Sequence, residues 1–439
     1  MTRRKPLPNR HPEGTRPARR GAFPIPDREP LPFQAGYPLG GGWGGVSGVF
    51  LIALLASLLL AACGGGDDDQ EPEQAATSEG GAVVTTTAGA SSDQTNNPQA
   101  TSDGSTTGQT PASGEPSTGD VRPEGPLTPE EVLHYQPNEL GQIPILEYHH
   151  LGPEPEQFVR TPDQFRGDLQ WLYDNNFYVV NLHDILADNI NVPAGKRPVA
   201  LTFDDSPASQ FSLIPLSDGR LAIDPNSAIG IMERFFIQHP DFGRGGHFSV
   251  LPGYFFDWDP AEGHPDQTPY IQDKFNWLVN NGYEIGNHTM DHANLVELTD
   301  EEIKYQLAEA NDAIHEIVPD VPIKVITLPY GMYPAGGDDT LFRGFDYQGG
   351  HYAWDAALMV GANPTVSPLS TEYDPYATAR IQAFDEELDK WFVVFSEQPG
   401  ILYVSDGDPN TVTVPEDLHP WLVGTLDMST IGDRELVRY

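Results

Sequence analysis

The sequence predicts an α/β fold with a largely parallel sheet, open or closed into a barrel, over residues 141–439. Short apolar runs rich in β-branched and aromatic residues recur through this region, and segments with helix signals stand between them. Polar residues follow several of the runs directly. Because parallel strands end at one common edge, we expect the functional site at the carboxyl ends of the strands.

The expected elements alternate along the chain. Thr161 followed by Pro162 predicts a helix start, and Thr299 with Glu302 forms a capping box at another. Helices are therefore expected at 161–176, 226–239, 269–282 and 299–318. Strands are expected at 143–150, 177–182, 197–205, 245–252, 283–289, 324–331 and 356–362.

Residues 1–62 have the character of an export leader. Eight basic and three acidic residues occur in the first 45, and "VSGVFLIALLASLLLAAC" follows them. A basic segment before an apolar stretch that ends in small residues is typical of a signal peptide. "LAAC", Leu60 to Cys63, resembles the lipobox of bacterial lipoproteins, in which the signal is cut before a cysteine that becomes lipidated. The alternative is an uncut anchor, because 46–62 is just long enough to span a bilayer.

Both alternatives place the rest of the chain outside the cytoplasm. With lipid on Cys63, the protein is expected to be exported and anchored to the cell membrane, facing the exterior or the periplasm. Cys63 is the only cysteine, so no disulfide is expected and the fold must depend on a packed core.

Residues 63–140 are expected to form a disordered tether. The segment begins "GGGDDDQEPEQ" and continues rich in Ser, Thr, Gly, Asp and Pro, with little that could be buried. Such a composition is typical of a solvated linker. The domain at 141–439 would then stand away from the membrane.

The chain is strongly acidic, with 24 basic and 64 acidic residues and a formal net charge of −40. Nucleic acid is excluded as a partner on this basis, because its binding depends on neutralised phosphates. The charge also disfavours strongly anionic polymers and suits neutral or cationic ones. A salt-adapted surface would explain it equally well.

Two adjacent carboxylates, Asp204 and Asp205, end the apolar run "ALTF". A charge at the end of a buried strand must be solvated, paired or metal-bound, because burying it alone is very unfavourable. Successive side chains of a strand point in different directions, so the two aspartates can serve two roles. Capping of a turn or of the next helix is the simpler alternative.

A histidine pair, His288 and His292, occurs in "NHTMDH" after a later strand. Histidines four residues apart share one face of a helical turn and can share a metal ion. Together with a strand-end aspartate they offer three ligands and leave positions open for water and substrate. That set is typical of a hydrolytic metal site rather than a structural one.

These motifs resemble those of the polysaccharide deacetylases of the NodB-homology type, carbohydrate esterase family four. "TFDD" is similar to the family's first motif, "HTMDH" to its second and "TLPYG", 327–331, to its third. The resemblance covers about 141–382. It implies a distorted (β/α)7-type barrel and the removal of N-acetyl, less often O-acetyl, groups from cell-envelope or extracellular glycans.

The resemblance also implies roles for individual residues. Asp204 would be the catalytic base, and the backbone N–H of Tyr330 would help to hold the oxyanion. Asp205, His288 and His292 would bind a divalent metal, with zinc the expected ion. The expected partners are then an N-acetylated polysaccharide and, through Cys63, a membrane.

Two parts of the family pattern are missing. Thr327 stands where an arginine usually orients the base, and Arg380 is a candidate to replace it from a later strand. The usual L-x-H motif, whose histidine protonates the leaving amine, has no clear counterpart; His149, His351 and His419 are candidates by residue type. A surface glycan-binding lipoprotein without turnover is therefore the alternative function, and hydrolysis of another amide or ester is a third.

Overall fold

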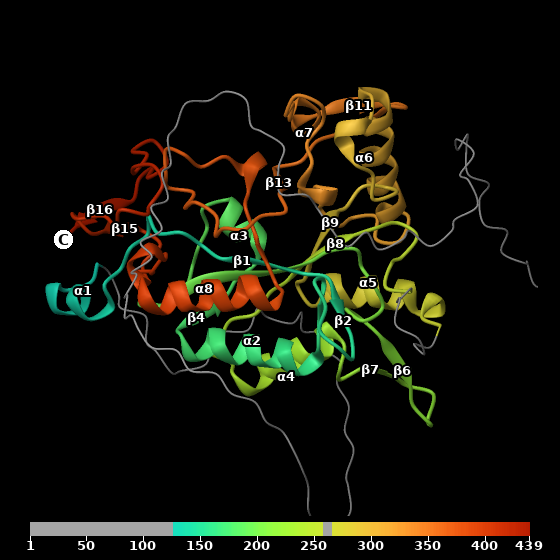
Figure 1. Cartoon of the computed structure of the whole chain (residues 1–439), viewed down its shortest axis with the longest axis horizontal. Coiled ribbons are helices and arrows are strands. Elements are labelled where there is room, and N and C mark those ends of the chain that lie inside the picture. Colours follow the sequence, from blue (N-terminus) through green and yellow to red (C-terminus); the bar gives the residue numbers. More distant parts are fainter. Residues whose placement is uncertain (1–125, 258–265) are drawn as a thin grey trace, which may run out of the picture. The chain divides into compact units, whose positions relative to one another are not determined.

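The computed structural model describes residues 126–257 and 266–439. Its main sheet is built of parallel pairs (Figure 1). The order across this sheet is β13 (Ala356–Leu358), β10 (Val325–Thr327), β9 (Glu284–Asn287), β8 (His247–Val250), β5 (Arg197–Phe203), β1 (Ile145–Tyr148) and β14 (Ile381–Gln382). An eighth strand, β4 (Phe177–Val179), pairs with the beginning of β5.

The sheet comes round on itself as a distorted barrel. Leu358, at the end of β13, forms a parallel bridge with Thr378. The N–H of Met359 donates to the Thr378 carbonyl, and the N–H of Thr378 donates to the carbonyl of Ala357. The chain then runs from Thr378 into β14, which pairs with β1. The predicted fold, a distorted barrel of seven strands, is confirmed.

Two apolar layers follow from the alternation of side chains along each strand. On β5, Leu201 and Phe203 point outward and join the larger core under the surrounding helices, whereas Ala200 points inward. The helices of the outer layer are α2 (Pro162–Asp174), α4 (Ala228–Gln238), α5 (Ile271–Asn280), α6 (Asp300–His315) and α8 (Asp385–Glu397). Strands buried on both faces explain the continuous apolar runs in the sequence.

The helix starts follow the capping signals of the sequence. The side chain of Thr161 accepts a hydrogen bond from the N–H of Gln164, and Thr299 does the same for Glu302. In both cases the side chain of the third helical residue accepts a hydrogen bond from the backbone N–H of the cap, which completes a capping box. The predicted helices at 161–176, 226–239, 269–282 and 299–318 are thus confirmed, with ends shifted by one to three residues.

The inner core is closed at the amino-terminal end of the barrel by a short helix, α3 (Leu182–Leu186). Leu182 and Ile185 of this helix pack with Ile145 of β1 and Val325 of β10. The strand predicted over 177–182 therefore ends early, at Val179, because the chain turns into α3.

The last residues of the chain do not join the barrel. Strands β15 (Thr411–Val414) and β16 (Glu435–Arg438) form a separate parallel pair with a small core of their own, which includes Leu140, Leu369 and Val412. In Figure 1 they lie apart from the barrel strands, on the side where α1 (Pro129–Tyr135) is drawn.

The predicted tether extends too far. Residues 129–135 form α1, which begins with a capping box at Thr128, and residues 138–140 are buried. The N–H of Asn138 donates to the carbonyl of Val404, so this segment is tied to the folded domain. The ordered chain thus includes at least residues 129–140, which the prediction had placed in the tether. The leader, Cys63 and the tether up to residue 125 lie outside the described residues.

The remaining elements are short. They are β2 (His150–Leu151), β3 (Val159–Arg160), β6 (Leu213–Pro215), β7 (Leu221–Ile223), α7 (Thr340–Arg343), β11 (Phe345–Tyr347) and β12 (Gly350–Tyr352). In the described part of the chain, no helix combines the length and the apolar character that crossing a membrane requires.

Candidate active site

Asp204 and Asp205 separate at the carboxyl end of β5. The N–H of Asp204 still donates to the carbonyl of Tyr148 on β1, so Asp204 continues the line of the strand. Asp205 and Ser206 then take positive φ angles of 70° and 49°. This left-handed turn, more than the strand alternation we expected, directs the two carboxylates to different places.

The histidine pair is brought together by a loop rather than by a helical turn, which corrects the prediction. Residues 288–294, after β9, contain no helix. Thr289 and His292 have positive φ, and the N–H of Thr289 donates to the side-chain oxygen of Asn287. Gln306 of α6 accepts hydrogen bonds from the N–H groups of Met290 and Asp291. The loop is therefore held by side chains that replace helical hydrogen bonds.

Left-handed backbone is concentrated at this site. Ten described non-glycine residues have positive φ, and five of them surround the two motifs: Asp205, Ser206, Thr289, His292 and Tyr330. Each such residue carries a conformational penalty of order 1–3 kcal/mol, and proteins collect such penalties where side chains must be placed for function.

The three predicted metal ligands meet in space. Asp205 Oδ1 lies 3.1 Å from His288 Nε2 and 3.5 Å from His292 Nε2. One donor atom from each residue falls within 4.8 Å of the other two. Neither Asp205 Oδ1 nor His288 Nε2 has a hydrogen-bond partner among the described residues, although both atoms are buried. Two imidazoles and a carboxylate suit zinc, so these residues fit the expected ion.

His288 is oriented by the strand beside it. Its Nδ1 lies 3.0 Å from the backbone carbonyl of Thr327 at the end of β10. A carbonyl can only accept, so Nδ1 carries the hydrogen, which leaves Nε2 as the atom of the neutral ring that could bind a cation.

The charges at the three ligands support one another. Burial raises the pKa of Asp205, but the nearby His288 and His292 outweigh burial and hold it well below its usual range. Burial lowers the pKa of His288, yet Asp205 and Asp204 outweigh that effect and raise it. Both shifts have one cause, because the carboxylates favour a positive charge on His288 and the imidazoles favour a negative charge on Asp205.

Asp204 is held by a buried arginine. Arg380 Nη1 and Nη2 each donate to one oxygen of Asp204 at 2.8 Å, and Arg380 is fully buried. Its Nε donates to the carbonyl of Met359, which aims the guanidinium. Burial raises the pKa of Asp204, but Arg380, His288 and His149 together outweigh it, so the net pKa is lowered. The structure thus places Arg380 beside Asp204, as the sequence analysis suggested. Thr327, which stands at the usual position of this arginine, has no positive charge with which to hold the carboxylate.

Glu147 is a residue of this site that the sequence analysis missed. It lies on β1 inside the barrel, 1% exposed, with Oε2 3.3 Å from Arg380 Nη2 and no hydrogen bond to either oxygen among the described residues. One guanidinium faces two carboxylates, and its paired hydrogen bonds go to Asp204. Burial accordingly raises the pKa of Glu147 to about 8, against the effect of Arg380. A glutamate inside the apolar run "IPILEY", on the same strand face as His149, was the available signal.

Glu147→Gln should change how stability depends on pH. The folded protein keeps a proton on Glu147 up to about pH 8, whereas the unfolded chain loses it near the ordinary value of ~4.3. The wild type should therefore lose unfolding free energy as pH rises between these values, by up to about 1.4 kcal/mol per pH unit. Urea unfolding at pH 5, 6.5 and 8 should show this loss in the wild type and not in the variant. Glu416→Gln, at an exposed position, is the control and should follow the wild type.

The three candidate proton donors have different surroundings. His149 lies with Nε2 3.7 Å from Glu147 Oε1, and its donor atoms fall within 4.8 Å of those of Glu147 and Asp204. His351 is on the exposed β11–β12 hairpin, 2.8 Å from Asp346, and His419 bonds to Gln398. Of the three, the structure brings His149 to the Asp204 side of the site.

Tyr330 also reaches the site. It follows β10 in a short 3-10 turn with φ of 59°, and its ring packs edge-on against His292 with centroids 4.7 Å apart. The residue is 42% exposed. The structure thus brings Asp204, Asp205, His288, His292 and Tyr330 together at the carboxyl ends of β5, β9 and β10.

Comparison with known proteins gives a family match. Residues 254–339 match the model of a family described as polysaccharide deacetylase, and this range includes His288, His292 and Tyr330. A chitooligosaccharide deacetylase of Sinorhizobium fredii is 28% identical over 133 residues, 30% of this chain and 51% of that protein. The chain thus spans about half the length of this relative. These matches support a domain of the polysaccharide deacetylase type.

Among solved structures, the chain is similar to the deacetylase PplD of Streptococcus pyogenes, with a TM-score of 0.41, 17% identity, and coverage of 57% of this chain and 97% of that chain. It is also similar to IcaB from Ammonifex degensii, with a TM-score of 0.41, 17% identity, and coverage of 58% and 96%.

Proposed function

We propose that this protein is a metal-dependent deacetylase that hydrolyses N-acetyl groups, and less readily O-acetyl groups, of a cell-envelope or extracellular polysaccharide. The observation that carries the proposal is the meeting of Asp205, His288 and His292 beside an aspartate held by Arg380. The family match and the chitooligosaccharide deacetylase relative support the substrate class.

The proposed metal ligands are Asp205, His288 and His292, and zinc is the proposed ion. A zinc ion there would lower the pKa of a bound water and polarise the acetyl carbonyl. His292 and Asp205 are each a little over one-fifth exposed, whereas His288 is buried. The acetyl group would therefore approach from the side of His292 and Asp205.

Asp204 is the proposed base, which takes a proton from the attacking water. Arg380 keeps it ionised and fixes its orientation. Each carboxylate oxygen keeps a further lone pair for this proton, since an ionised carboxylate offers about four acceptor sites. The backbone N–H of Tyr330 is the proposed donor to the oxyanion, and His149 the proposed proton donor to the leaving amine.

The proposed location is outside the cytoplasm, with a lipid on Cys63 as the anchor. This part of the proposal is supported by the leader and the "LAAC" motif of the sequence alone. Labelling of cells with a radioactive fatty acid tests it, because the wild type should carry the label and the Cys63→Ala protein should not.

Removal of metal should abolish deacetylation. Acetate release from N-acetylglucosamine oligomers should fall to background after chelation and return when zinc is added. His292→Ala should weaken zinc binding at this centre and lower the rate, because one of three ligands is lost. His351→Ala, a histidine outside the site, is the matched control and should behave as the wild type.

The outcomes separate the alternatives. Metal bound at this centre without acetate release would favour a glycan-binding protein that lacks turnover. Turnover that survives both chelation and the loss of His292 would contradict the proposed metal centre. A rate that falls in His149→Ala and not in His351→Ala would support His149 as the proton donor, and equal rates would remove it from the mechanism.

A further inference from the structure

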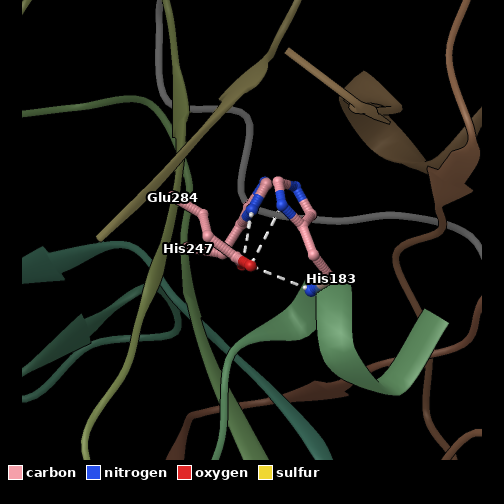
Figure 2. A group of neighbouring side chains, drawn as sticks. All are labelled: His183, His247 and Glu284. Carbon is pink, nitrogen blue, oxygen red and sulfur yellow. Dashed lines mark hydrogen bonds and ion pairs between the residues drawn. The ribbon is translucent and has the colours of Figure 1, made fainter. Parts of the chain in front are cut away.

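A second cluster of metal-binding side chains lies at the opposite end of the barrel. It consists of His183 at the start of α3, His247 at the start of β8 and Glu284 at the start of β9. Figure 2 shows the two imidazole rings and the carboxylate pointing toward one another. The mechanism proposed above uses none of these residues.

The carboxylate–imidazole distances of this cluster match those of the first centre, although here each imidazole faces a different oxygen of the carboxylate. Glu284 Oε1 lies 3.1 Å from His183 Nδ1, and Glu284 Oε2 lies 3.5 Å from His247 Nδ1. The corresponding carboxylate–imidazole distances in the first centre are also 3.1 and 3.5 Å. Ligands about 2.0–2.1 Å from a tetrahedral zinc ion stand roughly 3.3 Å apart. Both pairs of distances are close to that separation.

His247 is the observation that points to a ligand. It is fully buried, and neither of its ring nitrogens has a hydrogen-bond partner among the described residues. An imidazole left in this state forfeits hydrogen bonds that water would supply. Its Nδ1 faces Glu284, whereas its Nε2 packs against Gly286, where a side-chain β-carbon would lie only 2.3 Å from it. The glycine makes room for the ring, and Nδ1 is the atom that faces the other two residues.

Glu284 is held in place from its other side. Its two oxygens accept hydrogen bonds of 3.0 Å from the N–H groups of Leu182 and His183. These bonds fix the carboxylate and still leave it acceptor capacity. The carboxylate and the two imidazole rings can thus face one cation together.

We infer that His183, His247 and Glu284 form a second metal site whose ion is zinc. Two nitrogen donors and one carboxylate suit zinc better than magnesium or calcium, which take oxygen ligands. His183 is 18% exposed and the other two residues are 8% exposed or less. Water would complete the coordination on the side of His183, and the ion would bind α3 to β8 and β9.

The two centres are separate. Glu284 and His288 are four residues apart along one strand direction, so they point to the same face and lie ~13 Å apart. One ion cannot serve both, and each centre can be removed without changing a ligand of the other.

The test is zinc stoichiometry of the full chain after chelation. The wild type should bind two equivalents, and His183→Ala and His292→Ala should each bind one. The double variant should bind none, and His351→Ala should bind two. Glu284→Gln, which keeps the size of the side chain, should also bind one equivalent of zinc. This variant replaces His183→Ala in the test if His183→Ala does not fold.

Thermal unfolding gives a second readout that does not depend on activity. In the His292→Ala background, zinc should raise the melting temperature, because a ligand that binds only the folded state stabilises it. Adding His183→Ala should abolish the rise. A His292→Ala protein that binds no zinc, or a His183→Ala protein that still binds two equivalents, would overturn the inference. Loss of the first centre alone would contradict the proposed function and leave this site standing.

Discussion

Asp204→Asn is expected to reduce acetate release from N-acetylglucosamine oligomers by about 10²–10⁴-fold, the usual contribution of a general base. An amide has nearly the shape of the carboxylate but cannot take the proton of the attacking water. The zinc content of the first centre should stay at the wild-type level, because Asp205, His288 and His292 are unchanged. Steady-state kinetics and metal analysis on the same preparation check both statements.

The control for this prediction must share the chemical change. Asp346→Asn alters an aspartate whose side chain is 86% exposed on β11, and it should leave the rate unchanged. Because Asp204 is paired with Arg380, the variant must also be shown to be folded by circular dichroism. A folded Asp204→Asn protein with wild-type turnover would exclude Asp204 as the base.

Arg380→Met is expected to have the largest effect on stability. Methionine fills much of the same space but leaves the ionised Asp204 buried without its counter-charge. Breaking a buried ion pair by removing one partner costs about 3–5 kcal/mol. Urea unfolding at pH 7 should show a loss of this order.

The same substitution should change the pH dependence of catalysis. Arg380 lowers the pKa of Asp204 against the effect of burial. Without the arginine, Asp204 should hold its proton to a higher pH, so the acidic limb of the rate profile should move upward in pH. Arg380→Lys keeps a charge but loses the paired hydrogen bonds, and its effects should be smaller. An Arg380→Met protein with the stability and the rate profile of the wild type would contradict the role of Arg380.

Much of the fold was predictable because local signals agreed with the final structure. The capping residues Thr161 and Thr299 mark helix starts through hydrogen bonds to residues only three positions further along the chain. The apolar run of β5 is buried on both sides, so its pattern is continuous and easy to identify. The two-residue strand β14 carries no comparable pattern and was not predicted.

The residues of the site were likewise predictable from the sequence, whereas their geometry was not. The residue types Asp204, Asp205, His288 and His292 were identifiable because carboxylates and imidazoles stood directly after strands. The geometry that joins them was not, because it depends on a left-handed turn at Asp205 and on a loop at 288–294 that Gln306 holds from α6. Glu147 was overlooked for a related reason, since its importance comes from Arg380, which is 233 positions later.

The order of strands and helices, the capped helix starts and the polar residues at strand ends were thus determined by the sequence itself, because each depends on neighbours within a few positions. Barrel closure through Thr378, the pairing of Arg380 with Asp204 and the meeting of His183, His247 and Glu284 were decided only by the tertiary structure. These contacts join residues that lie far apart in the chain, and parallel strands bring them together without leaving a local trace in the sequence.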